Sequence, residues 1–183
     1  MKNTWRILGA VAALTLGPCT GGGDGGGDGN GGGGTGATCT GTFSGAVTGN
    51  VGTCSMTAVK IPSTGQLQFT IEFKPATGTG LSTDEVSTII TVLGDAKTAT
   101  YSGADIKEGL GTLYTTDNKA YELEILGGTQ RYGSATLTID SVPAGTPVGE
   151  RTNYAGFGGN AQIKFSTTNA TGDINLALTF KRP

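Results

Sequence analysis

The sequence predicts an all-β protein, built as a single antiparallel β-sandwich of about eight strands. Several segments alternate apolar and polar residues with a period of two, which is typical of strands with one buried face. Glycine is abundant, with 34 residues in a chain of 183, and this suits many short strands joined by turns. About 147 residues follow the glycine-rich segment, which is the size of one ordinary domain.

The first 18 residues are predicted to be a signal peptide. Lys2 and Arg6 precede an apolar run from Ile7 to Leu16, the arrangement of a secretory signal. The run is too short to cross a bilayer, which needs about 20 residues. We therefore expect residues 1–18 to be removed.

The segment Leu16-Gly17-Pro18-Cys19 resembles the lipobox of bacterial lipoproteins, which has Leu at its first position and Cys at its fourth. Pro18 departs from the small residues usual at its position. The resemblance implies that Cys19 becomes the first residue, carries a diacylglyceryl group and a further acyl chain such as palmitate, and anchors the chain in a membrane. Thr20, where Asp would mark inner-membrane retention, implies the outer membrane, on its periplasmic or surface face.

The count of three cysteines bears on the same question, because an odd number in an exported protein needs an explanation. Lipidation of Cys19 leaves an even pair, Cys39 and Cys54. The alternative is an uncut anchor, or a signal cleaved elsewhere, with Cys19 as a spare thiol.

Residues 19–36 form the predicted tether, in which Cys19 is followed by a run with twelve glycines and no apolar side chain. Nothing in this run can bury enough surface to offset the entropy of ordering the backbone. A flexible segment of this length has a typical reach of roughly 20 to 25 Å. The chain as a whole resembles small glycine-tethered lipoproteins of Gram-negative bacteria, of a kind frequent in myxobacteria.

Residues 37–183 form the predicted folded domain. Cys39 and Cys54 flank a Gly49-Asn50 turn signal, and in an exported protein we expect them to form a disulfide. A two-residue turn at Gly49-Asn50 would pair Cys39 with Lys60, so either the turn is wider or the bridge is not directly cross-strand.

Five further segments carry the strand alternation and are expected to form strands with one wet face. They are 67–74, 121–125, 135–139, 161–165 and 174–181.

Residues 82–93 carry conflicting signals. Ser82 to Glu85 has the form of a helix capping box, and apolar residues follow at helical spacing. The β-branched residues from Val86 to Val92 favour a strand instead. The sequence predicts a short helical turn over 83–87 that leads into a strand, with Asp84 and Glu85 explained by capping.

The absence of histidine removes the Ser-His-Asp and Cys-His arrangements and most zinc sites. The sequence predicts no metal and no cofactor. The net charge is −2 with no basic block, which excludes nucleic acid as an expected partner.

An enzyme would have to use a pair of carboxylates, as in glycoside hydrolysis. The candidates are Glu72, Asp105, Glu108, Glu122, Glu124, Asp140 and Glu150.

Residues 143–160 form the longest segment without a clear strand pattern in the second half of the domain. It carries Arg151, Asn153, Tyr154 and Phe157 among glycines. Long loops on a rigid sheet often bind ligands, and an exposed aromatic ring can stack on a sugar. The competing interpretation is that Tyr154 and Phe157 plug the open end of the sandwich.

These observations predict a membrane-tethered lipoprotein whose domain has a non-catalytic binding or structural role at the cell envelope. Its expected partners are the membrane, through the lipid anchor, and a glycan or an envelope protein. The alternatives are a carboxylate-dependent glycan hydrolase and a carbohydrate-binding module that uses the 143–160 loop.

Overall fold

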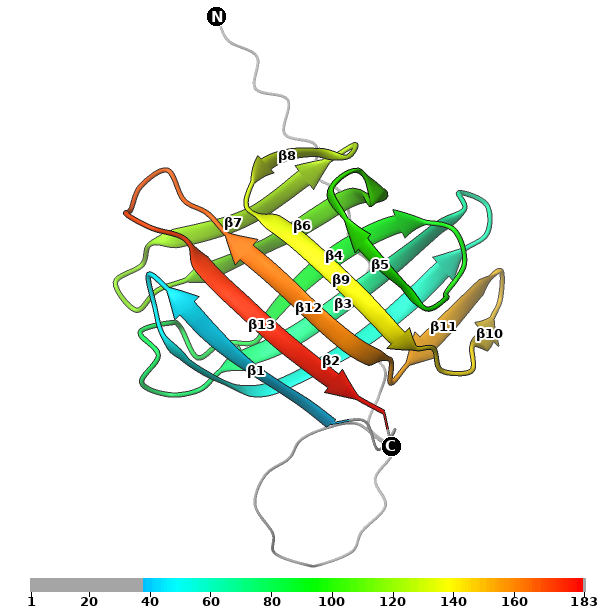
Figure 1. Cartoon of the computed structure of the whole chain (residues 1–183), viewed down its shortest axis with the longest axis horizontal. Coiled ribbons are helices and arrows are strands. Elements are labelled where there is room, and N and C mark those ends of the chain that lie inside the picture. The colour runs from blue at the N-terminus through cyan, green and yellow to red at the C-terminus, as the bar shows by residue number, and fades with distance from the viewer. Residues whose placement is uncertain (1–37, 183) are drawn as a thin grey trace, which may run out of the picture.

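The computed structural model describes residues 38–182, which form thirteen β-strands and one 3₁₀ turn, with no α-helix (Figure 1). The predicted signal peptide, Cys19 and the tether of residues 19–36 lie outside the described residues. The elements are β1 (Thr38–Gly45), β2 (Gly49–Ile61), β3 (Gln66–Pro75), β4 (Val86–Leu93), β5 (Ala99–Ser102), η1 (Gly103–Asp105), β6 (Ile106–Tyr114), β7 (Ala120–Leu126), β8 (Thr129–Tyr132), β9 (Ser134–Ser141), β10 (Thr146–Val148), β11 (Arg151–Ala155), β12 (Gly158–Phe165) and β13 (Ile174–Lys181).

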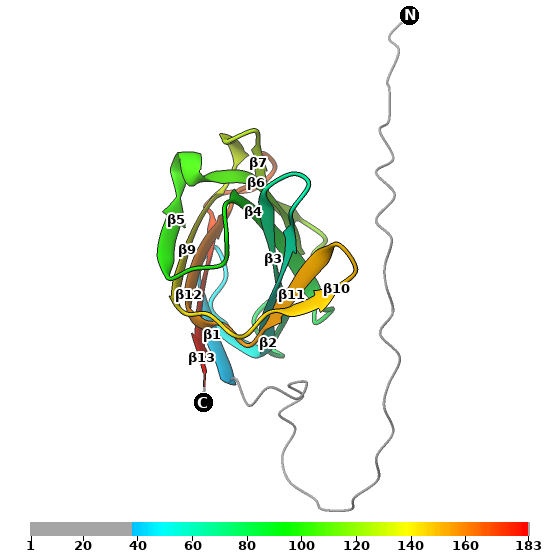
Figure 2. The same ribbon diagram turned by 90° about the vertical axis from the view of Figure 1, so that its right-hand side faces the viewer.

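The strands form one antiparallel sheet in the order β5-β9-β12-β13-β1-β2-β3-β4-β6-β7-β8, and the hairpin β10-β11 branches from β2. The sheet curls into a half-barrel whose two walls face each other (Figure 2). The all-β, antiparallel prediction is confirmed. The prediction of eight strands in a two-sheet sandwich is wrong, because β1 pairs with both β13 and β2 and so carries the ladder from one wall to the other.

The side of the half-barrel opposite β1 is held by a short contact between the two walls. The N–H of Glu122 donates to the carbonyl of Ser166 at 2.8 Å, and the N–H of Ser166 donates back at 2.9 Å. Gly133 turns the chain from β8 into β9 beside this contact. Its φ is 64°, and a Cβ there would lie 2.1 Å from the carbonyl oxygen of Lys164, so this corner requires glycine.

The core fills the space between the walls, and aromatic rings join them. The ring of Phe73 on β3 lies 6.0 Å from that of Phe43 on β1 and 6.5 Å from that of Phe165 on β12. All three side chains are buried. Five of the predicted strands contribute to this core, because the apolar residues of their alternation point inward. They are the strands predicted at 67–74, 121–125, 135–139, 161–165 and 174–181.

Strand β6 was not predicted, because glycines stand where its alternation would place apolar side chains. Gly109 and Gly111 pair with the buried Ile125 and Leu123, so they lie on the inward face. A Cβ at Gly109 would lie 3.0 Å from Cδ1 of Ile125. The neighbouring side chains already fill the space that a larger residue in β6 would need.

The helical turn predicted over 83–87 is absent, and the strand β4 begins at Val86. The Ser82 hydroxyl donates to Asp84 Oδ2 at 2.7 Å and accepts from the Asp84 N–H at 3.3 Å. These bonds close a local turn two residues long instead of capping a helix. Pairing of Val86 with Phe73 of β3 then favours the extended backbone.

The two ends of β1 lie on different sides of the molecule (Figure 1). Thr38 pairs with Lys181 at the entry end, where the described chain begins (Figure 1). Gly45 lies at the other end of β1, on the order of 25 Å away for an eight-residue strand. There the turn after β1 meets the loop before β4, since a Cβ at Gly49 would lie 2.5 Å from Thr79 Cγ2. We call this second end the groove end.

Candidate functional site: a polar groove between two strands

The sheet splits between β4 and β6 at the groove end. The ladder between these strands runs from Val92 paired with Ile106 to Ile89 paired with Leu110 and does not continue to 86–88 and 111–113. Further along, the loop before β4 returns to β6. Leu81 bridges Thr115, and the N–H of Ser82 donates to the carbonyl of Tyr114 at 2.8 Å. The split is therefore closed at both of its ends.

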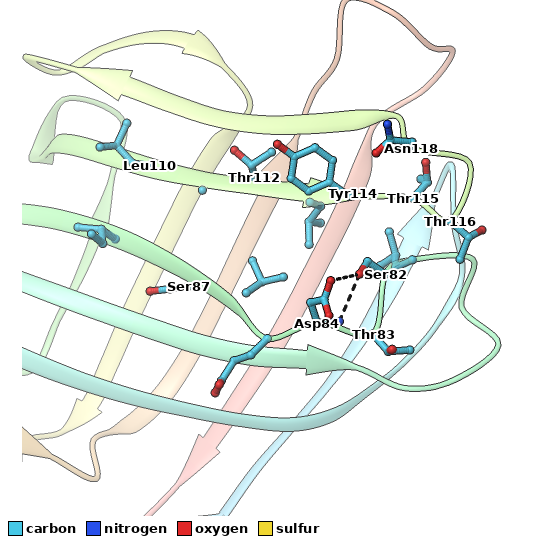
Figure 3. Close-up of a pocket in the computed structure, with 16 residues that line it drawn as sticks. Ser82, Thr83, Asp84, Ser87, Leu110, Thr112, Tyr114, Thr115, Thr116 and Asn118 are labelled. Carbon is cyan, nitrogen blue, oxygen red and sulfur yellow. Dashed lines mark hydrogen bonds between the residues drawn. The ribbon is translucent and has the colours of Figure 1, made fainter. Parts of the chain in front are cut away.

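The split forms a groove of about 1090 Å³ (Figure 3). Seven of its sixteen lining residues carry a hydroxyl group, two are acidic and none is basic. The lining comprises Leu81, Ser82, Thr83, Asp84, Glu85, Val86, Ser87, Ile89, Leu110, Gly111, Thr112, Leu113, Tyr114, Thr115, Thr116 and Asn118.

The outward face of β6 supplies one side of the groove. Leu110, Thr112 and Tyr114 alternate with inward residues, so their side chains form one row (Figure 3). Leu110 is 38% exposed and Tyr114 is 50% exposed, the two large apolar surfaces of the groove.

The turn of residues 115–119 holds the far end of that row. The Thr115 hydroxyl donates to Asp117 Oδ1 at 2.5 Å and accepts from the Lys119 N–H at 3.0 Å. Lys119 Nζ lies 2.6 Å from Asp117 Oδ2. The hydrogen bonds from Lys119 and Thr115 lower the pKa of Asp117, and the bond to Asp117 raises the pKa of Lys119. Asn118 takes the left-handed backbone conformation, with φ at 62°.

Beneath the groove lies a buried polar group that is not part of its lining. Thr88 on β4 is fully buried, and its hydroxyl oxygen is the buried side-chain atom without a hydrogen-bond partner in residues 38–182. It faces Gly111, where a Cβ would lie 2.7 Å from Thr88 Oγ1 and 3.2 Å from the Phe165 ring. Glycine at 111 therefore lets the two strands approach beneath the split.

A second, smaller hollow of about 290 Å³ adjoins the groove. It shares Leu110, Gly111 and Thr112 with the groove and is completed by Glu122, Leu123 and Glu124 of β7. The carboxylate of Glu124 is engaged, since Arg131 Nη1 donates to its Oε1 at 2.9 Å. The two hollows form one surface along the outer face of β6.

The predicted ligand segment 143–160 lies elsewhere. It contains strands β10 and β11, and β11 pairs with residues 57–60 of β2 toward the entry end. Phe157 is only 1% exposed, and its ring centre lies 5.4 Å from that of Phe69 and 6.0 Å from that of Tyr154. These contacts agree with the interpretation that the two rings plug the molecule. Arg151 and Asn153 are exposed on β11.

The carboxylates considered for catalysis are dispersed. Glu72 accepts from Ser55, Asp105 from the N–H of Ser102 and Glu108 from Thr91, each at 3.4 Å. Glu122 and Glu124 line the smaller hollow, while the acidic residues of the main groove are Asp84 and Glu85. Asp140 and Glu150 are exposed outside both hollows. Within residues 38–182 no cluster of three or more potential metal ligands occurs.

Sequence reasoning found one structural pair and missed the groove. Cys39 and Cys54 form the predicted disulfide. Two features of the sequence could have pointed to the groove. One is the pair of glycines in β6, and the other is the long loop of residues 76–85, which is rich in glycine, threonine and serine.

Fold and groove define the class: an all-β, antiparallel half-barrel with a hydroxyl-lined opening in one wall. No family model, curated protein or solved structure gave a match to the chain. The described residues include no helix with the length and apolar character needed to span a membrane.

Proposed function

We propose that this protein is a lipid-anchored lipoprotein of the cell envelope whose β domain binds a ligand in the groove without chemically changing it. Cys19 carries the lipid, residues 20–36 are the tether, and residues 37–183 are the binding domain. The outer membrane is the proposed location.

The observation that carries this proposal is the position of the groove relative to the start of the domain. The tether joins the domain near Thr38, at the entry end, while the groove opens near the far end of β1. A domain anchored through Cys19 can therefore turn the groove away from the membrane. The disulfide between Cys39 and Cys54 also supports export, because such bonds persist in oxidising compartments.

Binding rather than catalysis is supported by the state of the groove carboxylate Asp84. It accepts a hydrogen bond from Ser82 and holds the local turn before β4.

A second candidate, a carboxylate-dependent glycan hydrolase, is favoured by one observation only. Glu122 and Glu124 are two residues apart on β7 and line the smaller hollow together, so their Cα atoms are roughly 7 Å apart.

Metabolic labelling with a palmitate analogue tests the anchor. We expect label in the wild-type protein and none in the Cys19→Ala variant, and equal labelling of both would overturn the anchor.

Incubation of the protein with neutral polysaccharides, followed by assay of new reducing ends, tests the absence of catalysis. Release of reducing ends that the Glu122→Gln variant abolishes would favour the hydrolase instead.

A further inference from the structure

We infer that the groove binds a neutral oligosaccharide. This inference rests on the proposed function and specifies the ligand of the same groove. It is carried by three features of the described residues: the chemistry of the lining, the closed ends of the split, and the exposed ring of Tyr114.

The lining matches a polyhydroxyl ligand. Each serine, threonine or tyrosine hydroxyl both donates and accepts hydrogen bonds, and the Asn118 amide also offers both functions, as sugar hydroxyls require. The acidic residues Asp84 and Glu85, without a basic residue in the lining, disfavour an anionic ligand such as a phosphate or a polyuronate. A neutral ligand meets no such penalty.

The strand edges inside the split add backbone groups. Alternation along β6 directs the N–H and C=O of Thr112, like those of Tyr114, toward β4, yet the β4–β6 ladder gives Thr112 no partner. Backbone groups of this kind need a hydrogen-bond partner, which sugar hydroxyls can provide.

A peptide strand is a poorer fit for the same edges. Strand addition uses a sheet edge along which an extended chain can run. Here the split is closed by the pair Ile89–Leu110 on one side and the bridge Leu81–Thr115 on the other. Only residues 111–114 of β6 lie between them, a length of about 13 Å. A compact chain of sugar rings lying across the outer face needs no longer edge.

The apolar part of a sugar ring also finds a surface. Tyr114 is half exposed on the outer face of β6, beside Thr112, and its ring can stack on the C–H face of a pyranose (Figure 3). The smaller hollow continues the surface past Leu110 to Glu122 and Glu124. The combined space exceeds that of a single ring, so we assign an oligosaccharide and not a monosaccharide.

The test uses the mature chain from residue 19 with Cys19→Ser, which removes the lipid and the third thiol. The probes are the neutral hexasaccharides of α-1,4-glucose, β-1,4-glucose, β-1,4-mannose and β-1,4-N-acetylglucosamine. Polygalacturonate and a blocked neutral pentapeptide serve as the anionic and peptide probes. Binding is measured by calorimetry and by tyrosine fluorescence, since the one tryptophan of the chain, Trp5, precedes residue 19.

We expect at least one neutral hexasaccharide to bind with a sub-millimolar dissociation constant. Tyr114→Ala should weaken that binding about tenfold or more, whereas Tyr114→Phe, which keeps the ring, should retain it. The matched control is Val148→Ala, because Val148 is an exposed apolar residue outside both hollows. This variant should bind the sugar as tightly as the chain that carries only Cys19→Ser. The unfolding midpoint of each variant is measured in parallel.

Three results would overturn the assignment. They are no binding of any neutral hexasaccharide, binding that Tyr114→Ala leaves unchanged in a folded protein, and binding of polygalacturonate or the pentapeptide as tight as that of the sugars. The palmitate labelling is independent of these results. If no sugar binds but the palmitate label is found on Cys19, the proposed ligand is wrong and the proposed lipid anchor is not contradicted.

Discussion

The Cα atoms of Cys39 and Cys54 lie 5.5 Å apart, and their disulfide joins β1 to β2 where the two strands are not paired. Strand β1 pairs along its whole length with β13, but it pairs with β2 only at Thr42 and Phe43. The covalent bond thus closes the curve of the sheet near the entry end, where a ladder is missing.

Removal of this disulfide should lower stability without unfolding the domain. In the chain-entropy model, a loop closed over 15 residues contributes about 3 kcal/mol. We expect the double variant Cys39→Ala, Cys54→Ala to lose roughly that amount of unfolding free energy, measured by urea denaturation. An unchanged urea midpoint would show that the bond does not constrain the fold.

The buried hydroxyl of Thr88 predicts a stabilising substitution. Thr88→Val keeps the shape of the side chain and removes a buried polar atom that has no partner within residues 38–182. We expect a gain on the order of 1 kcal/mol in urea denaturation. Thr91→Val is the matched control on the same strand, because the buried Thr91 donates to Glu108 Oε2 and its replacement should cost about 1 kcal/mol. A loss for Thr88→Val would mean that its hydroxyl is satisfied in solution.

Phe157 and Asn153 separate packing from binding in the 143–160 segment. Phe157→Ala deletes a buried ring that contacts Phe69 and Tyr154, so we expect it to cost about 3–5 kcal/mol of stability. Asn153→Ala changes an exposed residue and should alter stability by less than about 0.5 kcal/mol. Both are measured by chemical denaturation. A small effect for Phe157→Ala would contradict its role as a plug.

The turn that ends the groove predicts a dependence on acid. The pKa of Asp117 is lowered by its hydrogen bonds from Lys119 and Thr115, so its contribution is present above the pKa of the unfolded chain, near 4. That contribution is lost as the pH falls through the lowered folded pKa. Asp117→Asn should therefore be less stable than the wild type at pH 6, and the difference should shrink as the pH falls below about 4.

The paired measurement is the urea midpoint of both proteins at the two pH values. Lys119 behaves in the opposite way at high pH, since its pKa is raised. Its contribution to stability is present below the ordinary lysine pKa and is lost as the pH rises through the raised pKa of the folded protein. A difference between the proteins that stays constant from pH 6 to pH 3 would contradict the assignment to the Asp117 carboxylate.

The sequence predicted those elements whose side chains alternate without interruption. Strand β3 is the clearest case, because Leu67, Phe69, Ile71 and Phe73 all point into the core and their polar neighbours face outward. The same code was absent from β6, where Gly109 and Gly111 occupy inward positions. Local signals also gave the wrong conformation at residues 83–87, because a serine followed by acidic residues closes either a helix cap or a short turn.

The amino-acid sequence by itself determined the all-β class, the alternation of buried and exposed faces, and the cysteine pair, because each depends on residue type and on spacing along one segment. Only the tertiary structure decided the curl of the sheet, the pairing of β1 with both walls, and the groove between β4 and β6. The groove depends on register between segments about 25 residues apart in the chain, where Ile89 meets Leu110 but 86–88 do not meet 111–113. Such register is set by packing across the whole sheet, which no single segment encodes.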